Sequence, residues 1–255
     1  MTALIDTHAH LDEIEGIVPA LELAKLAGVT AIIAVGQDLN SNKKTLNLAA
    51  QYPGFVFPAI GLHPWAIGSM DPAQLEENIA FIKGNLSNAV ALGEVGLDYD
   101  KRVLKGAGKD IQKEVLGHLL ELAINYDKPV SLHSRYAWKD SLSLVREAGI
   151  KRLVFHWYTG FSSTLSELIE AGYYISATPA AEYHEEHRRA IREVPAEKLL
   201  LETDCPVFYG RENRYRSEPA DVARSLRATV EIKGMDEADL AAITTSNAHR
   251  LFSIR

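Results

Sequence analysis

The chain has 255 residues, of which 47% are hydrophobic and 24% charged, with a formal net charge of −7 and a single cysteine, Cys205. The acidic balance argues against broad, passive adhesion to nucleic acid, but it permits an enzyme that holds nucleic acid through metal ions and a few local arginines. One cysteine excludes an intramolecular disulfide and suits a reducing compartment. No apolar run reaches membrane-spanning length and no signal-like segment opens the chain, so we expect a cytoplasmic protein that does not enter the membrane.

Short apolar runs alternate with longer amphipathic segments along the whole chain. Eight runs have the length and composition of strands, at residues 3–6, 30–36, 55–61, 88–94, 129–133, 152–156, 172–178 and 198–203. Helical periodicity is found between and after them, for example at 17–28, 42–52, 72–85, 112–126, 219–234 and 236–252. Alternating strands and helices predict a parallel sheet covered on both faces. We therefore predict an α/β protein, a (β/α)8 TIM barrel forming one domain over residues 1–255, with a doubly wound open sheet as the alternative.

The first run ends in an acid and two histidines, Asp6, His8 and His10. Side chains alternate along a strand, so both imidazoles point to the same side, as two ligands of one metal ion would. An H-x-H pair is a weak motif by itself, and a solvated strand end is the competing interpretation. The ends of the later strands decide between the two.

Histidines and carboxylates also follow the later strands, namely His63, Glu94, Asp98, His133, His156, Glu202 and Asp204. A parallel barrel gathers the carboxyl ends of its strands on one face, so these residues are expected to converge there. Imidazole and carboxylate ligands suit zinc, manganese or similar divalent ions, and a central carboxylate can bridge two of them. The pattern predicts a binuclear metal hydrolase rather than a set of solvated loop tips.

Seven segments resemble, in order, the signatures of the TatD family of metal-dependent deoxyribonucleases, which belongs to the amidohydrolase-like barrels. They are DTHAHLD, GLHPW, GEVGLDY, PVSLHSR, VFHWYTG, LLLETDCP and TTSNAHRLF. Each segment is short, but the ordered set covers nearly the whole chain. The resemblance implies a DNA substrate, two divalent metal ions (Zn, Mn or Mg) and hydrolysis of phosphodiester bonds from a strand end by a metal-activated water.

The resemblance also implies six metal ligands, which are His8, His10, Glu94, His133, His156 and Asp204. The first ion would take the H-x-H pair and Asp204, and the second would take the two later histidines. Glu94 would bridge both ions. Asp204 would also act as the general base toward the attacking water.

Three further residues are predicted to meet the substrate. His63 matches the family's G-x-H-P and is expected to contact a phosphate or the leaving group, with a part in catalysis. Arg135 could hold a phosphate oxygen with its planar fork. Trp65 stands where many members carry a second histidine, and it either stacks on a base or is an ordinary half-buried aromatic residue.

Other features have weaker implications. Trp157 and Tyr158 depart from the family pattern and bear on substrate choice. His184 and His187 could form an accessory metal site, but a solvated charged helix face is favoured. The basic, aromatic loop 211–216 either follows a nucleic-acid backbone or is a surface loop whose arginines pair with Glu212 and Glu218.

The proposed centre permits several functions. A phosphodiesterase should have cations around the mouth of the site. A hydrolase of a carboxylic ester, an aminoacyl ester on tRNA or an amide could use a smaller apolar pocket, walled by Trp65, Trp157 and Tyr158. A non-catalytic barrel would not need so many ligands. The chain has no P-loop or G-x-G-x-x-G, so we expect no nucleotide cofactor, and we expect a monomer.

Overall fold

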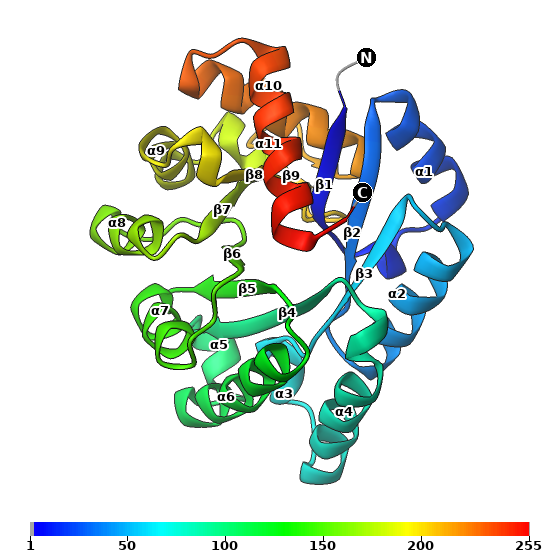
Figure 1. The fold of residues 1–255 in the computed structure, drawn as a ribbon, viewed down its shortest axis with the longest axis vertical. Helices are drawn as coiled ribbons and strands as arrows, with labels where there is room; N and C mark the ends of the chain where they lie inside the picture. The colour runs from blue at the N-terminus through cyan, green and yellow to red at the C-terminus, as the bar shows by residue number, and fades with distance from the viewer. Residues whose placement is uncertain (1–2, 255) are drawn as a thin grey trace.

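Eight parallel strands follow one another around a barrel in the computed structural model, which describes residues 3–254 (Figure 1). They are β1 (Leu4–Ala9), β2 (Val29–Val35), β3 (Val56–Ile60), β4 (Ala91–Asp98), β5 (Val130–Arg135), β6 (Leu153–Phe155), β7 (Tyr174–Ala177) and β8 (Leu199–Leu201). The barrel closes beside β8, where the His10 amide donates to the Cys205 carbonyl at 2.8 Å and the Asp204 amide donates to that of His8 at 2.9 Å. The predicted TIM barrel is confirmed, and the alternative prediction of a doubly wound open sheet is wrong.

Helices surround the strands (Figure 1). They are α1 (Ile17–Leu26), α2 (Leu39–Gln51), α3 (Pro64–Ile67), α4 (Pro72–Asn85), α5 (Lys101–Leu104), α6 (Lys109–Asn125), α7 (Trp138–Glu147), α8 (Ser162–Glu170), α9 (Glu185–Glu193), α10 (Val222–Lys233) and α11 (Glu237–Phe252). Asp38 and Asp71 cap α2 and α4, which explains where these helices begin. The periodicity did not predict the short helices α3 and α5, or the hairpin of β9 (Phe208–Tyr209) and β10 (Tyr215–Arg216).

Alternation along the strands divides the apolar core into two layers. In β2, Ile32 and Ala34 belong to the layer that packs against the helices, whereas Ile33 and Val35 belong to the inner cluster of the barrel. All four side chains are fully buried. Each strand therefore needs apolar residues on both faces, which is why the strands appear in the sequence as nearly continuous apolar runs.

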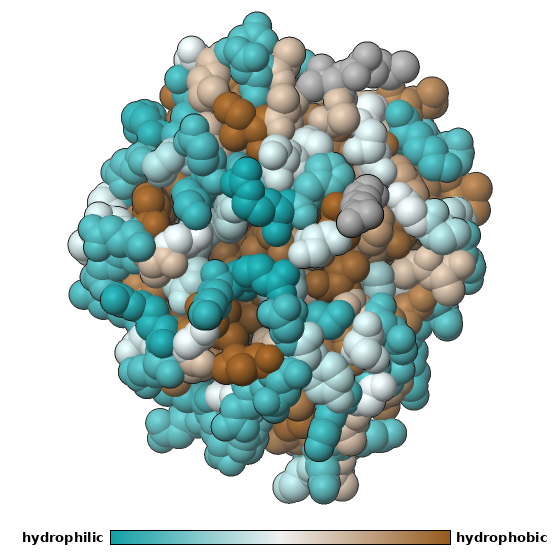
Figure 2. Space-filling model, in the orientation of Figure 1, coloured by the Kyte–Doolittle hydropathy of each residue, from teal (hydrophilic) through white to brown (hydrophobic). Residues whose placement is uncertain are grey.

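The C-terminal helix α11 covers one end of the barrel, and in Figure 1 it crosses in front of β1. Its residues Leu251 and Phe252 join the inner cluster, and Asn247 donates to the carbonyl of Leu199 at the start of β8. This end therefore holds the amino ends of the strands. Figure 2 shows the same face, on which hydrophilic residues lie both at the rim and across the middle, with apolar ones visible between them. Within residues 3–254, no helix has both the length and the apolar character needed to span a bilayer.

Candidate metal centre

The carboxyl ends of the strands bring together the histidines and carboxylates that the sequence analysis selected. β1 and its end supply His8 and His10, β4 supplies Glu94, and β5 ends with His133. The segments after β3, β6 and β8 supply His63, His156 and Asp204. Six of these seven residues are buried, and His133 is nearly so.

Glu94 lies at the centre of the cluster, and its two oxygens face different pairs of histidines. Oε2 lies 3.5 Å from Nε2 of both His8 and His10. Oε1 lies 2.9 Å from Nδ1 of His133 and 2.8 Å from Nε2 of His156. Burial opposes the charge of Glu94, but the surrounding imidazoles outweigh burial and hold its pKa well below the usual value. Glu94 is therefore ionised and in contact with both pairs.

Asp204 faces the first pair. Its Oδ1 lies 3.2 Å from Nε2 of His10 and 3.7 Å from Nε2 of His8. The backbone of Asp204 has φ +50°, an unusual conformation for a residue other than glycine, and the barrel closure described above holds it there. Burial opposes ionisation of Asp204, but His10 and His8 lower its pKa, so this carboxylate is also charged.

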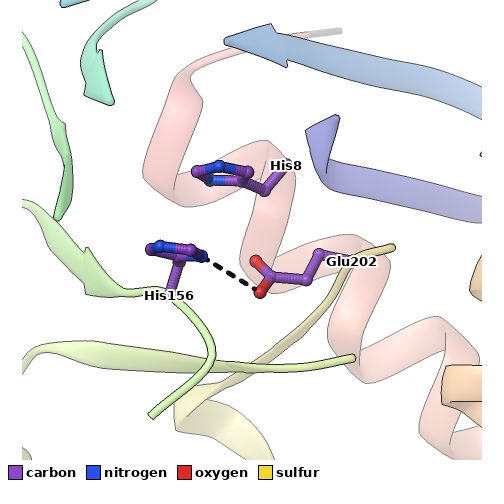
Figure 3. Close-up of side chains that lie close together, drawn as sticks. All are labelled: His8, His156 and Glu202. Carbon is purple, nitrogen blue, oxygen red and sulfur yellow. Dashed lines mark ion pairs between the residues drawn. The ribbon is translucent and has the colours of Figure 1, made fainter. Parts of the chain in front are cut away.

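His8 and His156 lie face to face, with ring centroids 4.1 Å apart and planes 9° from parallel (Figure 3). Nδ1 of His156 lies 3.4 Å from a carboxylate oxygen of Glu202, beside the two rings. Two buried ring nitrogens, Nε2 of His8 and Nδ1 of His156, have no hydrogen-bond partner among residues 3–254. Unpaired imidazole nitrogens beside ionised carboxylates fit a divalent cation, which would satisfy both.

In the described part of the chain, geometry alone selects three groups of side chains that could each hold an ion. They are His8, His10 and Asp204; His63, Glu94 and His133; and His8, His156 and Glu202. The first group is the one predicted for the first ion. Each of the other two groups contains one of the two histidines predicted for the second ion. His63 joins His133 in one group, and Glu202 joins His156 in the other.

Polar residues outside the cluster hold several of the imidazoles. Asp98 Oδ2 lies 3.1 Å from Nε2 of His133. Gln37 and Ser131 lie 2.9 Å and 3.1 Å from the Nδ1 atoms of His10 and His8. The sequence analysis missed Gln37 and Ser131. Gln37 directly follows the second apolar run. A search of the strand ends for amides as well as for acids would therefore have selected it.

His63 and Trp65 are linked through the backbone. The amide of Trp65 donates to Nδ1 of His63 at 3.1 Å, which leaves the proton of the neutral ring on Nε2, 3.4 Å from Glu94. Burial, against the attraction of Glu94, lowers the pKa of His63 to about 4, so the ring is neutral at pH 7. Trp65 is 55% exposed, and the N–H of its indole donates to Asp98 at 2.6 Å.

A cavity of about 1370 Å³ opens over the cluster. Its wall includes Arg135, Trp65 and Trp157, whereas Tyr158 is fully buried and forms no part of the wall. Arg135 pairs with Asp100 at 3.0 Å and keeps about a third of its side chain exposed. This volume exceeds that of typical small-molecule pockets.

Two of the weaker predictions are corrected. His187 does not lie on a solvated face: it is fully buried, its Nε2 accepts from the Thr178 amide and its Nδ1 lies 2.9 Å from the Tyr158 carbonyl. Both nitrogens are therefore occupied, which leaves none for a metal ion. In the 211–216 loop, Arg211 and Arg216 donate to the backbone carbonyls of Tyr183 and Glu13 instead of pairing with Glu212 or Glu218.

The barrel, and the imidazoles and carboxylates at the carboxyl ends of its strands, define the class of the protein: a metal-dependent hydrolase. Residues 5–253 match the family described as TatD related DNase. The chain belongs to this family, as its seven ordered segments predicted.

Similar proteins support this membership over nearly the full length. Human deoxyribonuclease TATDN3 is 31% identical, with 98% of this chain and 94% of the human protein covered. The metal-dependent hydrolase YabD of Bacillus subtilis is 33% identical over 98% of this chain and 99% of its own. The crystal structure of YjjV, a TatD homologue from Escherichia coli, superposes with a TM-score of 0.88 at 27% identity and covers 99% of this chain and 98% of YjjV.

Proposed function

We propose that the chain is a deoxyribonuclease that hydrolyses phosphodiester bonds at the end of a DNA strand, using two divalent metal ions. The observation that carries the proposal is the position of Glu94, whose two oxygens face the His8/His10 pair and the His133/His156 pair separately. A carboxylate in this position suits a bridge between two cations. The size of the cavity and the presence of Arg135 in its wall favour a long, anionic substrate.

The proposed ligands are those of the two clusters around Glu94. His8, His10 and Asp204 would hold one ion, and His133 and His156 the other. Four imidazoles among six ligands favour zinc over magnesium, and the two carboxylates also suit manganese. When bound, such ions lower the pKa of water and neutralise charge on a phosphoryl group.

The side chains of the site have complementary parts in the reaction. Asp204 lines the cavity and is ionised, so it can accept the proton that the attacking water loses. As the new bond to phosphorus forms, the bond to the leaving oxygen breaks, and that oxygen takes a proton from solvent. His63 can donate a hydrogen bond from Nε2 to a phosphate or leaving oxygen, because its Nδ1 is occupied by the Trp65 amide.

The first test is the Asp204→Asn variant. Incubated with end-labelled single-stranded DNA and Mg²⁺ or Mn²⁺, the wild type should shorten the strand, and the variant should be slower by roughly 10²–10⁴-fold because the base is lost. A circular dichroism spectrum like that of the wild type would show that the variant is folded. Cleavage at the wild-type rate would contradict the role of Asp204. No cleavage by wild-type protein that holds two ions would favour a carboxylic or aminoacyl ester substrate.

Four finer points belong to the same proposal. We propose that the barrel acts as one domain, works as a monomer, needs no nucleotide cofactor and resides in the cytoplasm. The single, buried Cys205 suits a reducing compartment. Light scattering tests the monomer, and cell fractionation tests the location.

A further inference from the structure

Large aromatic side chains project into the cavity beside the proposed metal ligands. Tyr136 and Phe161 are 59% and 61% exposed, and both line the cavity together with Trp138. Tyr136 lies three residues after His133, and Phe161 five residues after His156. The segments that follow these two proposed ligands therefore carry exposed rings.

The surrounding structure holds these rings in place. Trp138 contacts both edge-on, with its centroid 5.9 Å from that of Tyr136 and 5.4 Å from that of Phe161. The Tyr158 hydroxyl donates to the Phe161 carbonyl at 2.9 Å. A side chain on Gly160 would lie 2.6 Å from the Trp138 ring, so the loop depends on glycine there to pack against the tryptophan. The three aromatic residues thus form a preorganised surface, which we call the aromatic platform (Tyr136, Trp138 and Phe161).

The aromatic platform has two features that cost stability. Tyr136 has φ +57°, a conformation that is strained for a residue with a bulky side chain. Exposed apolar rings also leave their surface in contact with water. Strain and exposure at the mouth of a site are typical of residues that serve a ligand.

The chemistry beside the aromatic platform indicates which ligand. The Arg135 guanidinium lies 5.5 Å from the centroid of the Tyr136 ring, and Arg189 lines the same cavity. Flat rings next to guanidinium groups are the combination with which proteins bind single-stranded nucleic acid, because bases stack on the rings while cations meet the phosphates.

Building on the proposed nuclease function, we propose that the aromatic platform binds an unpaired nucleobase next to the scissile phosphate by stacking it on Tyr136 and Phe161. A base inside a duplex has both faces covered by its neighbours, so it cannot reach the rings. The platform would therefore bind the DNA strand through an unpaired base, and it would accept any of the four bases.

The test compares two labelled single-stranded oligonucleotides that differ only in whether the nucleotides at the cleaved end carry bases or are abasic. Binding is measured by fluorescence anisotropy with the Asp204→Asn protein, and cleavage with the wild type. The oligonucleotide with bases should bind about 5- to 150-fold more tightly than the abasic one. Tyr136→Leu or Phe161→Leu should remove most of this difference, whereas Phe161→Tyr, which keeps the ring, should retain it.

Phe208→Leu is the matched control, because Phe208 is 53% exposed but does not line the cavity. Phe208→Leu should show the same difference in affinity between the two oligonucleotides as the protein without this substitution. Equal affinity for the two oligonucleotides together with normal cleavage would overturn the aromatic platform alone. A second outcome is tighter binding of the oligonucleotide with bases, while the wild type cleaves neither oligonucleotide. It would support the platform but contradict the nuclease proposal.

Discussion

Single side chains around the proposed ligands set their orientation. Asp98 is fully buried, and its Oδ2 meets both Nε2 of His133 and the indole N–H of Trp65. Burial opposes ionisation of Asp98, but the bonds from His133 and Trp65 lower its pKa to about 2. With Nε2 held by Asp98, Nδ1 of His133 is the nitrogen turned toward Glu94. Asp98 is therefore a positioning residue for the proposed second ion.

Asp98→Asn should weaken the affinity for one of the two ions by about 10- to 100-fold, because the neutral amide holds the imidazole less firmly. Titration of the metal-free protein with Mn²⁺ or Zn²⁺ in a calorimeter measures this change. Asp100→Asn is the control, since Asp100 pairs with Arg102 and Arg135 instead of a histidine. Two unchanged affinities in Asp98→Asn would show that Asp98 does not position a ligand.

At the scale of elements, the barrel separates stability from chemistry at its two ends. α11 packs its apolar residues into the amino end, while the carboxyl ends of the strands and the loops after them carry the polar cluster. His187 links α9 to the barrel, because its ring forms hydrogen bonds with Thr178 after β7 and with Tyr158 after β6. Changes in α11, or at His187 in α9, should therefore affect folding more than the reaction.

Phe252→Ala should lower the free energy of unfolding by about 3–5 kcal/mol, because it removes a buried ring from the inner cluster and leaves a cavity. Urea denaturation measures the loss. Leu26→Ala, at a side chain that is 75% exposed, should change stability by less than about 0.5 kcal/mol. A loss in Phe252→Ala no larger than that of the control would mean that α11 does not secure the barrel.

The His187 interaction should make folding sensitive to acid. Burial lowers the pKa of His187 to about 4, against 6.5 for an unperturbed histidine, although the Tyr158 carbonyl opposes this shift. The unfolded chain therefore takes up the proton first, and stability falls as pH drops from about 6.5 toward 4, by about 2 kcal/mol at pH 5. His187→Asn should lose less stability than the wild type between pH 7 and pH 5 in urea unfolding. Equal losses in the two proteins would contradict a neutral, buried His187.

For the whole molecule, the candidate metal centre joins segments that are far apart in the chain. His8 and Asp204 are 196 positions apart in the sequence and meet at the closure of the barrel. An ion held between them would bind the folded chain and not the unfolded one. Metal binding and closure of the barrel should therefore stabilise each other.

Removal of metal with a chelator should lower the melting temperature, and added Mn²⁺ or Zn²⁺ should restore it. The gain is about 2.7 kcal/mol when the free ion is at 100 times its dissociation constant. Differential scanning calorimetry at several metal concentrations measures this dependence. A melting temperature that is the same with chelator and with metal would show that no ion binds preferentially to the folded barrel.

The sequence by itself determined the order of strands and helices and the strand ends at which His8, Glu94 and Asp204 lie. Periodicity and chain order carry this information, because each depends on residues that are near one another in the sequence. The ordered motifs also identified the family. Only the tertiary structure decided which atoms meet: that Gln37 reaches His10, that Trp65 donates to Asp98, that His187 is buried and that Tyr136 and Phe161 share a cavity. These contacts depend on the directions of side chains from distant elements, which the closed barrel imposes and no local pattern encodes.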